Sequence, residues 1–292
     1  MNEARIRLFD ALEAGDRFWN SEIKEHGADQ VLDRIVHDGY SDSPRSTERA
    51  KKRLNSRTLD DLLGELDRSS SRFISSEDEE WPHLLNDLVS PPIGLVIKGG
   101  EVSCDAIAIV GTRNPTNYGA RISNEFAAAF SDRNLVVVSG GAYGIDSHAH
   151  RGAIAAEGRT FAVLASGIAV NYPAGNERLF ADIADSGALI SEVMPFERAR
   201  PDRFLTRNRL IAGLSRATIV VEAAFRSGSL RTARESAELL RAVLAVPGPI
   251  TSPTSDGCHR LIGERCAEII TSASDALELI DLSACTLCGD DT

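Results

Sequence analysis

The chain has 292 residues, which is enough for one large domain or for a large domain and a small one. Hydrophobic residues make up 42% of it, and no apolar run approaches the length of about 18 residues that a membrane-spanning helix needs. The formal net charge is −11, which argues against nucleic-acid binding by bulk attraction to phosphate. Any nucleic-acid site would therefore be a local basic patch on an acidic body.

The cysteines and the N-terminal residues indicate where the protein works. Five cysteines at irregular spacing are too few for a disulfide framework in a chain of this length. Residues 1–19 carry charges throughout and lack the apolar core of a secretory signal. We therefore expect a cytoplasmic protein in a reducing compartment, with no membrane partner.

The first part of the chain predicts helices. Amphipathic periodicity favours helices over residues 3–14 and 28–37 and a longer one over about 47–67. Three consecutive serines at 69–71 interrupt the pattern and are typical of a linker. The short apolar run Ile93–Ile97 is expected to form an edge strand of the domain that follows.

From residue 106 onward, short apolar runs alternate with helical patterns. The runs are rich in Val and Ile and show no polar alternation, which is typical of strands buried on both faces. Their alternation with helical patterns, such as 120–130 and 232–240, predicts an α/β fold with a parallel, doubly wound sheet. The expected strands are 106–110, 135–138, 160–164, 188–190, 218–221, 242–246 and 268–270.

These patterns divide the chain into three parts. We expect a small helical domain over residues 1–68, a doubly wound domain over 73–282 and a tail over 283–292. In a doubly wound sheet, ligands bind beyond the carboxyl ends of the strands. The residues that follow each strand are therefore the candidates for a binding site.

Glycines follow two of the expected strands. Gly111 and Arg113 come after the first strand, where glycine lets a ligand approach the backbone and the guanidinium matches phosphate. The second strand ends in a glycine-rich turn before a helix, which presents N–H groups and a positive dipole end to an anion. A tight turn with Asp146 as the helix cap is the equally weighted alternative. The candidate residues of the turn are Ser139, Gly140, Gly141 and Gly144.

Later strand ends add aromatic, polar and basic side chains. Tyr172 offers a ring for stacking on a base, and Asn176 either joins the site or caps the next helix. The stretch from Phe196 to Arg216 holds six arginines against two acidic residues, which indicates an anionic partner. The alternative is a solvated face that pairs with the acidic N-terminal region. The remaining candidates are Ser227, Gly228 and Ser229 in a small-residue turn, and the arginines Arg198, Arg200, Arg203, Arg207, Arg209 and Arg216.

Arg207, Asn208 and Arg209 are expected where a loop enters a helix, with Thr206 as the cap. Residues two apart on a helix diverge by about 200°, so only one of the two arginines should face the site. The apolar residues that follow favour Arg207 for the pocket, and Arg209 should pair or pack elsewhere. We expect Arg113→Ala and Arg207→Ala each to weaken ligand binding and to leave thermal stability nearly unchanged.

Motifs for common catalytic chemistry are missing from the sequence. No Gly-x-x-x-x-Gly-Lys-Ser/Thr or His-Glu-x-x-His pattern occurs. His148 and His150 lie two apart on an expected helix and point to different faces, so a shared metal is not expected. Cys285 and Cys288 form half of a zinc motif and are assigned to the tail, and Cys258 is expected to be a packed thiol. We expect no metal, no cofactor and no catalytic residue.

An ordered set of blocks from about residue 73 to 270 resembles the DprA/Smf family, DNA-processing protein A. No single block is decisive, but their order is highly specific. The blocks are Val110–Pro115 with Tyr118-Gly119, Ser139–Asp146 with Ala149-His150, Tyr172-Pro173 with Asn176, Ser191-Glu192, Arg207–Ser215, Glu222-Ala223, Arg226–Leu230, Val246–Gly248 and Gly257-Cys258.

This resemblance implies an extended Rossmann-like core, usually in a homodimer, without an established enzymatic reaction. It implies that the protein binds and protects single-stranded DNA and helps to load the RecA recombinase in natural transformation. Arg113 and Arg207–Arg209 would contact phosphates, and the 139–144 turn would form the floor of the pocket. The chain departs from the family at Ala174 and Tyr143, where basic residues are common. Too few residues follow the core for the winged-helix domain that many members carry.

Two other functions fit the same expected fold. Nucleoside-monophosphate phosphoribohydrolases resemble it and carry a Pro-Gly-Gly-x-Gly-Thr-x-x-Glu motif, of which this chain keeps Thr232 and Glu235 but not the Pro-Gly-Gly. Glu235 would then be the catalytic carboxylate, although a solvated position on a charged helix is expected for it. The second alternative is a sensor whose pocket binds a small signalling nucleotide and whose N-terminal region transmits the change.

Overall fold

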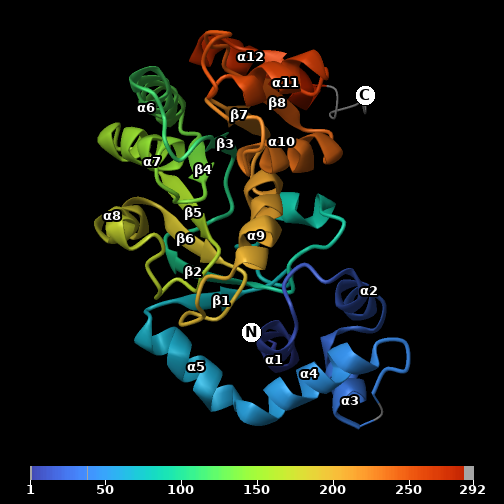
Figure 1. Ribbon diagram of the computed structural model, residues 1–292. Coiled ribbons are helices and arrows are strands. Elements are labelled where there is room, and N and C mark those ends of the chain that lie inside the picture. The colour runs from blue at the N-terminus through green and yellow to red at the C-terminus, as the bar shows by residue number, and fades with distance from the viewer. Residues whose placement is uncertain (1, 38, 286–292) are drawn as a thin grey trace, which may run out of the picture.

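Figure 1 shows the computed structural model, which describes residues 2–37 and 39–285. A nine-stranded sheet lies at the centre in the order β1-β2-β6-β5-β4-β3-β7-β8-β9, with helices on both faces. The strands from β6 to β9 in that order run parallel, whereas β2 pairs antiparallel with both β1 and β6. This arrangement confirms the expected α/β class and the mostly parallel, doubly wound, Rossmann-like sheet.

The strands agree closely with the apolar runs of the sequence, because most of these runs are strands buried on both faces. The exception is the last strand, Glu268–Ile269, whose two residues are exposed. The parallel strands are β3 Ala106–Val110, β4 Val136–Ser139, β5 Thr160–Leu164, β6 Ala188–Ser191, β7 Ala217–Val220, β8 Ala242–Ala245 and β9 Glu268–Ile269.

The antiparallel end of the sheet corrects one prediction. The run expected as an edge strand forms β2 (Leu95–Gly99), which lies between β1 and β6 in the sheet. The edge is instead β1 (Arg72–Ile74), a three-residue strand in which Phe73 pairs with Val96. A strand of this length is too short to show a periodicity, so the sequence pattern did not reveal it.

Among the described residues, the helices that precede the sheet are α1 Glu3–Ala11, α2 Arg17–His26, α3 Ala28–His37, α4 Pro44–Ser56 and α5 Leu59–Arg68. The single helix expected over 47–67 is thus two helices. The break falls at Thr58, whose side chain accepts from Asp61 N while the Asp61 carboxylate accepts from Thr58 N. This reciprocal capping starts a new helix and directs the chain toward the edge of the sheet.

Helices of the later part cover both faces of the sheet. They are α6 Asn117–Ser131, α7 Ile145–Ala155, α8 Glu177–Ser186, α9 Pro201–Gly213, α10 Ser229–Glu238, α11 Asp256–Gly263 and α12 Ala273–Cys285, and short 3₁₀ helices span η1 His83–Asp87 and η2 Ala174–Asn176. Helix α12 therefore enters the predicted tail, and residues 286–292, with Cys288, lie outside the described residues. No helix within the described ranges has both the length and the apolar character to cross a bilayer.

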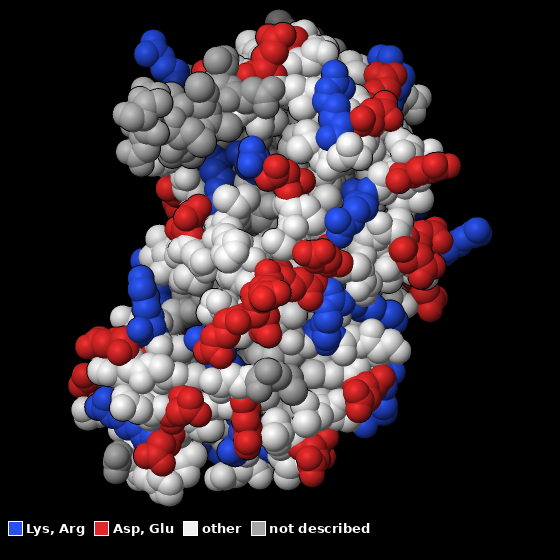
Figure 2. All heavy atoms as spheres, turned by 180° about the vertical axis from the view of Figure 1, so that it is seen from behind, with Lys and Arg blue, Asp and Glu red and all other residues white. Residues whose placement is uncertain are grey.

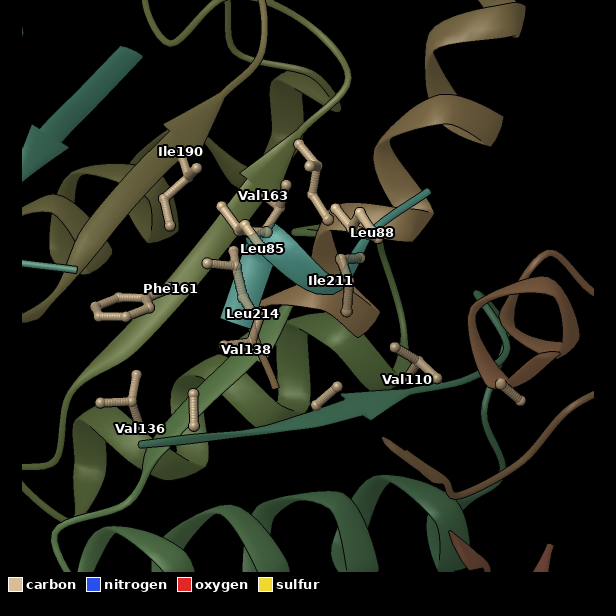
Figure 3. Packing of buried hydrophobic residues seen from close by; sticks show 14 of the residues in the cluster. Leu85, Leu88, Val110, Val136, Val138, Phe161, Val163, Ile190, Ile211 and Leu214 are labelled. Carbon is tan, nitrogen blue, oxygen red and sulfur yellow. The ribbon is translucent and has the colours of Figure 1, made fainter. Parts of the chain in front are cut away.

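Three hydrophobic clusters join these layers. Helices α9, α10 and α11 pack on one face of the sheet. There Ile211 of α9 and Leu214 directly after it meet Leu85 of η1 and Leu88 directly after it, over the strands (Figure 3). Helices α6, α7 and α12 pack on the other face. The third cluster joins α1–α5 and α8 to the antiparallel end of the sheet, so the N-terminal helices share a core with the sheet. In Figure 1 these blue helices lie at the β1 end, opposite α11 and α12.

The order of the strands creates one switch point. Strand β3 pairs with β4 on one side, with Ile107 opposite Val137, and with β7 on the other, with Ile107 opposite Ala217. The chain proceeds from β3 toward β6 in one direction and from β7 toward β9 in the other. The loops that leave β3 and β7 therefore diverge, and they leave a crevice beyond their carboxyl ends.

Candidate nucleic-acid interface

A cleft of about 430 Å³ opens at this switch point. Its walls come from the loop after β3, the turn after β4, the loop after β7 and one face of α9. A cleft of this size is within the range of pockets that bind small molecules or parts of a polymer. The lining residues are Val110, Gly111, Thr112, Arg113, Ala142, Asp146, Phe204, Leu205, Arg207, Asn208, Ile211, Ala224, Ser227, Gly228, Ser229 and Thr232.

Arg113 is the exposed cation of the cleft. It lies two residues beyond Gly111, on the loop that joins β3 to α6, and its guanidinium lies 5.8 Å from the centroid of the Phe204 ring. Across the described part of the chain, Arg113 takes part in no ion pair, whereas Arg200, Arg203 and Arg209 of the arginine-rich stretch do. Its charge is therefore available to an anion that enters from solvent.

Arg207 is the buried cation of the same cleft, with a relative exposure of 8%. Its Nη1 donates to the carbonyl oxygen of Val163 at 3.1 Å, and a Cβ at Gly140 would overlap the guanidinium. Burial lowers the pKa of Arg207 to about 10, and the positive charge of Arg113 acts in the same direction. Arg207 Nε is buried without a partner. In the cleft, the constrained guanidinium of Arg207, which has one hydrogen-bond donor without a partner, therefore lies beside the free guanidinium of Arg113.

Asp146 is the buried counter-charge of Arg207. Its Oδ2 accepts from Gly140 N at 3.1 Å and from Ala142 N at 3.4 Å. Burial raises the pKa of Asp146, whereas the Arg207 charge opposes that rise. The alternative prediction, in which Asp146 caps α7, is wrong, because Gly144 is the N-cap of that helix. Two N–H groups of the turn that was expected to hold an anion are therefore bonded to a carboxylate of the protein.

A smaller hollow of about 90 Å³ adjoins the cleft. It shares Arg113, Ala142, Phe204 and Arg207 with the cleft and adds an aromatic wall. Tyr172 is 48% exposed, and its ring centroid lies 5.4 Å from that of Phe204. The cations therefore stand between an open cleft and a set of rings that offers stacking surface to a base. The other lining residues of the hollow are Gly140, Tyr143, Ala165 and Pro173.

The structure brings together nine of the fourteen residues predicted for the site. The cleft contains Gly111, Arg113, Arg207, Asn208, Ser227, Gly228 and Ser229, and the hollow adds Gly140 and Tyr172. Asn208 Nδ2 donates to the carbonyl oxygen of Gly228 at 3.3 Å and ties α9 to the loop after β7. The Ser227 and Ser229 hydroxyls are bonded to each other at 2.6 Å.

The other predicted residues support the turn from outside the cleft. Ser139 is fully buried and donates to the carbonyl oxygen of Ile109 at 2.6 Å. Asn176 occupies the N-cap position of α8 without a capping hydrogen bond from its side chain, and its Nδ2 donates to the carbonyl oxygen of Gly141 at 2.9 Å. Gly144 begins α7 with a φ of 83°. None of these residues lines the cleft or the hollow.

Arg207 and Arg209 diverge as the helical spacing predicts. Arg209 leaves the cleft and pairs with buried Glu192 at 2.5 Å, whereas Arg207 lines the cleft. Their position in the helix differs from the prediction, because α9 begins at Pro201 and not after Thr206. Proline is favoured in the first turn of a helix, so both arginines lie well inside it.

The arginine-rich stretch is largely neutralised within the protein. Arg203 pairs with Glu197 at 3.0 Å, and Arg216 pairs with Asp105 at 2.8 Å. Arg200 pairs with Asp202 at 2.7 Å and with Glu13 of the N-terminal region at 3.5 Å, as the alternative of a paired face predicted. Figure 2 shows the molecule from behind, and on that opposite face acidic and basic side chains are interspersed. The excess of arginine in the sequence therefore does not form a basic surface, and the local charge of the cleft comes from Arg113 and Arg207.

Comparison with known proteins identifies the family. The family model described as DNA recombination-mediator protein A matches residues 72–281. The chain belongs to this family. It is 42% identical to the putative DNA processing protein DprA of Mycobacterium tuberculosis, over 95% of this chain and 70% of that protein. It is 41% identical to the DNA processing protein DprA of Streptococcus pneumoniae, over 68% of this chain and 71% of that protein.

Solved structures of DprA proteins have the same fold. The X-ray structure of DprA from Streptococcus pneumoniae matches with a TM-score of 0.82 and 32% identity, over 95% of this chain and 98% of that one. DprA from Helicobacter pylori, whose structure is described as revealing a single-stranded DNA binding mode, matches with a TM-score of 0.66 and 27% identity. That match covers 75% of this chain and 98% of the other.

Within the DprA fold, the sequence prediction missed Phe204. This residue separates the cleft from the hollow and contacts both Tyr172 and Arg113. Phe204, Arg207 or Asn208, and Ile211 recur at helical spacing and all line the cleft. A helix that begins at Pro201 would have placed Phe204 on the same face as Arg207, so the missing signal was the proline.

The groups weighed for catalysis or metal binding lie apart. His150 is fully buried with Nδ1 2.7 Å from Thr160 Oγ1, whereas His148 Nδ1 lies 3.2 Å from Asn124 Nδ2. Cys258 is buried, and burial raises its pKa to about 12, as for an inert packed thiol. Glu235 pairs with Arg231 at 3.3 Å and does not line the cleft.

Proposed function

We propose that this protein binds single-stranded DNA in the cleft at the β3–β7 switch point. The observation that carries the proposal is the pair formed by Arg113 and Arg207, which line the same cleft and of which Arg113 is exposed and takes part in no ion pair within the described residues. Two guanidiniums against one buried carboxylate leave a local positive charge on a protein of net charge −11. A phosphate between the two guanidiniums would accept charge-assisted hydrogen bonds from both.

The aromatic hollow supports single strands over duplexes. A base can stack on the rings beside Phe204 only when its own face is free, which is the case in an unpaired strand. A duplex exposes phosphates but not base faces, and the paired charges of the arginine-rich stretch supply no broad basic surface for it. The site therefore favours a strand whose phosphate lies at the arginines and whose base lies in the hollow.

A binding panel tests this function. Fluorescence anisotropy would measure the affinity for oligo(dT), for a duplex of equal length and for mononucleotides at two salt concentrations. We expect oligo(dT) to bind more tightly than the duplex, with an affinity that falls as salt rises. Equal affinity for strand and duplex would overturn the proposal. Tight binding of a mononucleotide with none of oligo(dT) would favour the nucleotide sensor.

We also propose that the bound strand is passed to the RecA recombinase in the cytoplasm and that the protein acts without catalysing a reaction. Membership of a recombination-mediator family supports the transfer to RecA. RecA filament formation on strands coated by single-strand-binding protein should accelerate when this protein is added. Unchanged filament kinetics would contradict the transfer, and release of free base from nucleoside monophosphates would contradict the absence of catalysis.

We also propose that the protein forms a homodimer through the later part of its Rossmann-like core. Exposed apolar residues between residues 230 and 280 support it: Leu240 is 94% exposed, Ile250 88% and Ile269 53%. Ile269 belongs to β9, the strand at the end of the sheet. Light scattering should give twice the monomer mass, and a monomer at micromolar concentration would reject the dimer.

A further inference from the structure

The loop that joins β7 to α10 carries an aromatic ring and a cation at the tip of a tight turn. Ser227 N donates to the carbonyl oxygen of Ala224 at 3.0 Å, which closes a four-residue turn. Phe225 and Arg226 occupy the two central positions of that turn. Because Ala224 and Ser227 line the cleft, the tip stands at its rim.

Phe225 lies at the surface, outside the hydrophobic core. Its side chain is 51% exposed, so it contributes little to burial. The guanidinium of Arg260, on α11, lies 4.5 Å from the centroid of the ring and covers one of its faces. The exposed half of the ring is left open to solvent, as a stacking surface for a planar group.

Helix α11 holds this ring in a fixed position. The Arg260 guanidinium pairs with Glu264 at 2.5 Å, which orients it over Phe225. Gly257 N donates to the carbonyl oxygen of Ala223 at 2.8 Å, and a Cβ at Gly257 would come within 2.6 Å of that oxygen. The helix and the turn are therefore in direct contact. A ring that is ordered before binding loses little conformational entropy when a ligand stacks on it.

Arg226 adds a free charge beside the ring. Arg231 and Arg234 on the next helix are paired with Glu235 and Glu264. Arg226 is exposed and takes part in no ion pair within residues 2–37 and 39–285. An open ring next to an unpaired guanidinium offers what a nucleotide presents, namely a base face and a phosphate.

We propose that Phe225 and Arg226 form a second contact for single-stranded DNA, in which a base stacks on Phe225 and a neighbouring phosphate pairs with Arg226. This inference rests on the proposed function, because the strand has to occupy the cleft. A strand that joins the Tyr172 hollow to the turn passes Arg113 and Arg207, which line both spaces between them. The turn therefore contacts only strands that are long enough to cross the cleft.

Affinities of variants for two lengths of oligo(dT), about 4 and about 20 nucleotides, test the second contact. Phe225→Leu removes the aromatic face and keeps apolar bulk, Phe225→Trp restores a face, and Arg226→Ala removes the charge. Val89→Ala is the control, since Val89 is 77% exposed and lines neither space. Arg113→Ala reports on the cleft itself.

We expect Phe225→Leu to weaken binding of the long strand by roughly 5- to 100-fold and to leave the short strand nearly unaffected. Phe225→Trp and Val89→Ala should bind like wild type, and Arg226→Ala should lower the salt slope by about 0.7. Wild-type affinity of Phe225→Leu while Arg113→Ala loses binding would overturn the second contact and keep the proposed function. Wild-type affinity of both Phe225→Leu and Arg113→Ala would overturn the second contact and the proposed function together. Equal losses in Phe225→Leu and Phe225→Trp would assign the ring a packing role and overturn the stacking.

Discussion

The guanidinium of Arg207 is held by its surroundings before any ligand arrives. It lies over Gly140, donates to Val163 and faces Asp146, all in a buried position. Arg113 has none of these supports and lies in solvent. The two arginines of one cleft therefore contribute differently to the fold, although both face the same proposed phosphate.

Removal of Arg207 should destabilise the protein. Arg207→Ala leaves Asp146 as a buried carboxylate without its counter-charge, which costs about 3–5 kcal/mol of the free energy of unfolding. Arg113→Ala should leave that free energy unchanged within roughly 0.5 kcal/mol. Urea unfolding of both variants measures the difference. This expectation replaces the one drawn from the sequence, in which both substitutions left stability unchanged. Equal stability of the two variants would contradict the buried pair.

His150 should make stability depend on pH. Burial lowers the pKa of His150 to about 3, with the nearby Arg207 charge acting in the same direction. Because the folded pKa lies below the unfolded value of about 6.5, the stabilising contribution is complete above pH 6.5. It is lost as the pH falls toward 3, by about 1.4 kcal/mol per pH unit. Urea unfolding across this window should show the slope in wild type and a flatter one in His150→Gln. Identical slopes in wild type and His150→Gln would contradict the assignment of this pH dependence to His150.

At the scale of elements, α9 packs closely against the turn after β4. The turn contains a glycine where the Arg207 guanidinium lies, so the helix can approach the strand ends closely. The sequence predicted both elements, and it predicted the parallel strands well because all of them except β9 are largely buried on both faces. It did not reveal their contact, since the pairing of Gly140 with Arg207 depends on how α9 crosses the sheet. For the same reason the sequence did not reveal the role of Asp146, which accepts hydrogen bonds from N–H groups of the turn and does not cap the helix.

Substitution of Gly140 should disturb the helix and the turn together. A Cβ at this position overlaps the Arg207 guanidinium, so Gly140→Ala has to displace it. We expect a loss of about 1–3 kcal/mol in stability and weaker binding of oligo(dT). Gly263→Ala is the matched control, because no atom lies within 4 Å of its added methyl group. Thermal melts and anisotropy of both variants provide the measurement, and a Gly140→Ala protein that behaves like Gly263→Ala would refute this packing.

At the scale of the whole molecule, the N-terminal helices and the sheet share one hydrophobic cluster. Charges strengthen the junction: Asp10 pairs with Arg57 at 2.5 Å and with Arg53, which also pairs with Glu197 of the loop before α9. The sequence predicted a linker and a separate helical domain from its serines. Such a boundary does not reveal how the helices pack on the sheet, because the packing residues lie far apart in the chain.

This junction predicts a single unfolding transition. Trp19 lies in the N-terminal helices, so its fluorescence reports on them once Trp81→Phe removes the other tryptophan. Far-UV circular dichroism reports on all helices and strands. The two urea curves of Trp81→Phe should coincide, as they do for one cooperative unit. A fluorescence transition that comes first would show that the N-terminal helices unfold on their own.

The salt dependence of oligo(dT) binding in Arg113→Ala tests most directly whether the cleft is the site. Loss of one phosphate contact should weaken binding by about 1–3 kcal/mol and lower the salt slope by about 0.7. Arg133→Ala removes an exposed arginine outside the cleft and should match wild type in both quantities. If Arg113→Ala instead binds oligo(dT) with the wild-type affinity and slope at physiological salt, the cleft does not hold the DNA phosphate and the account is contradicted.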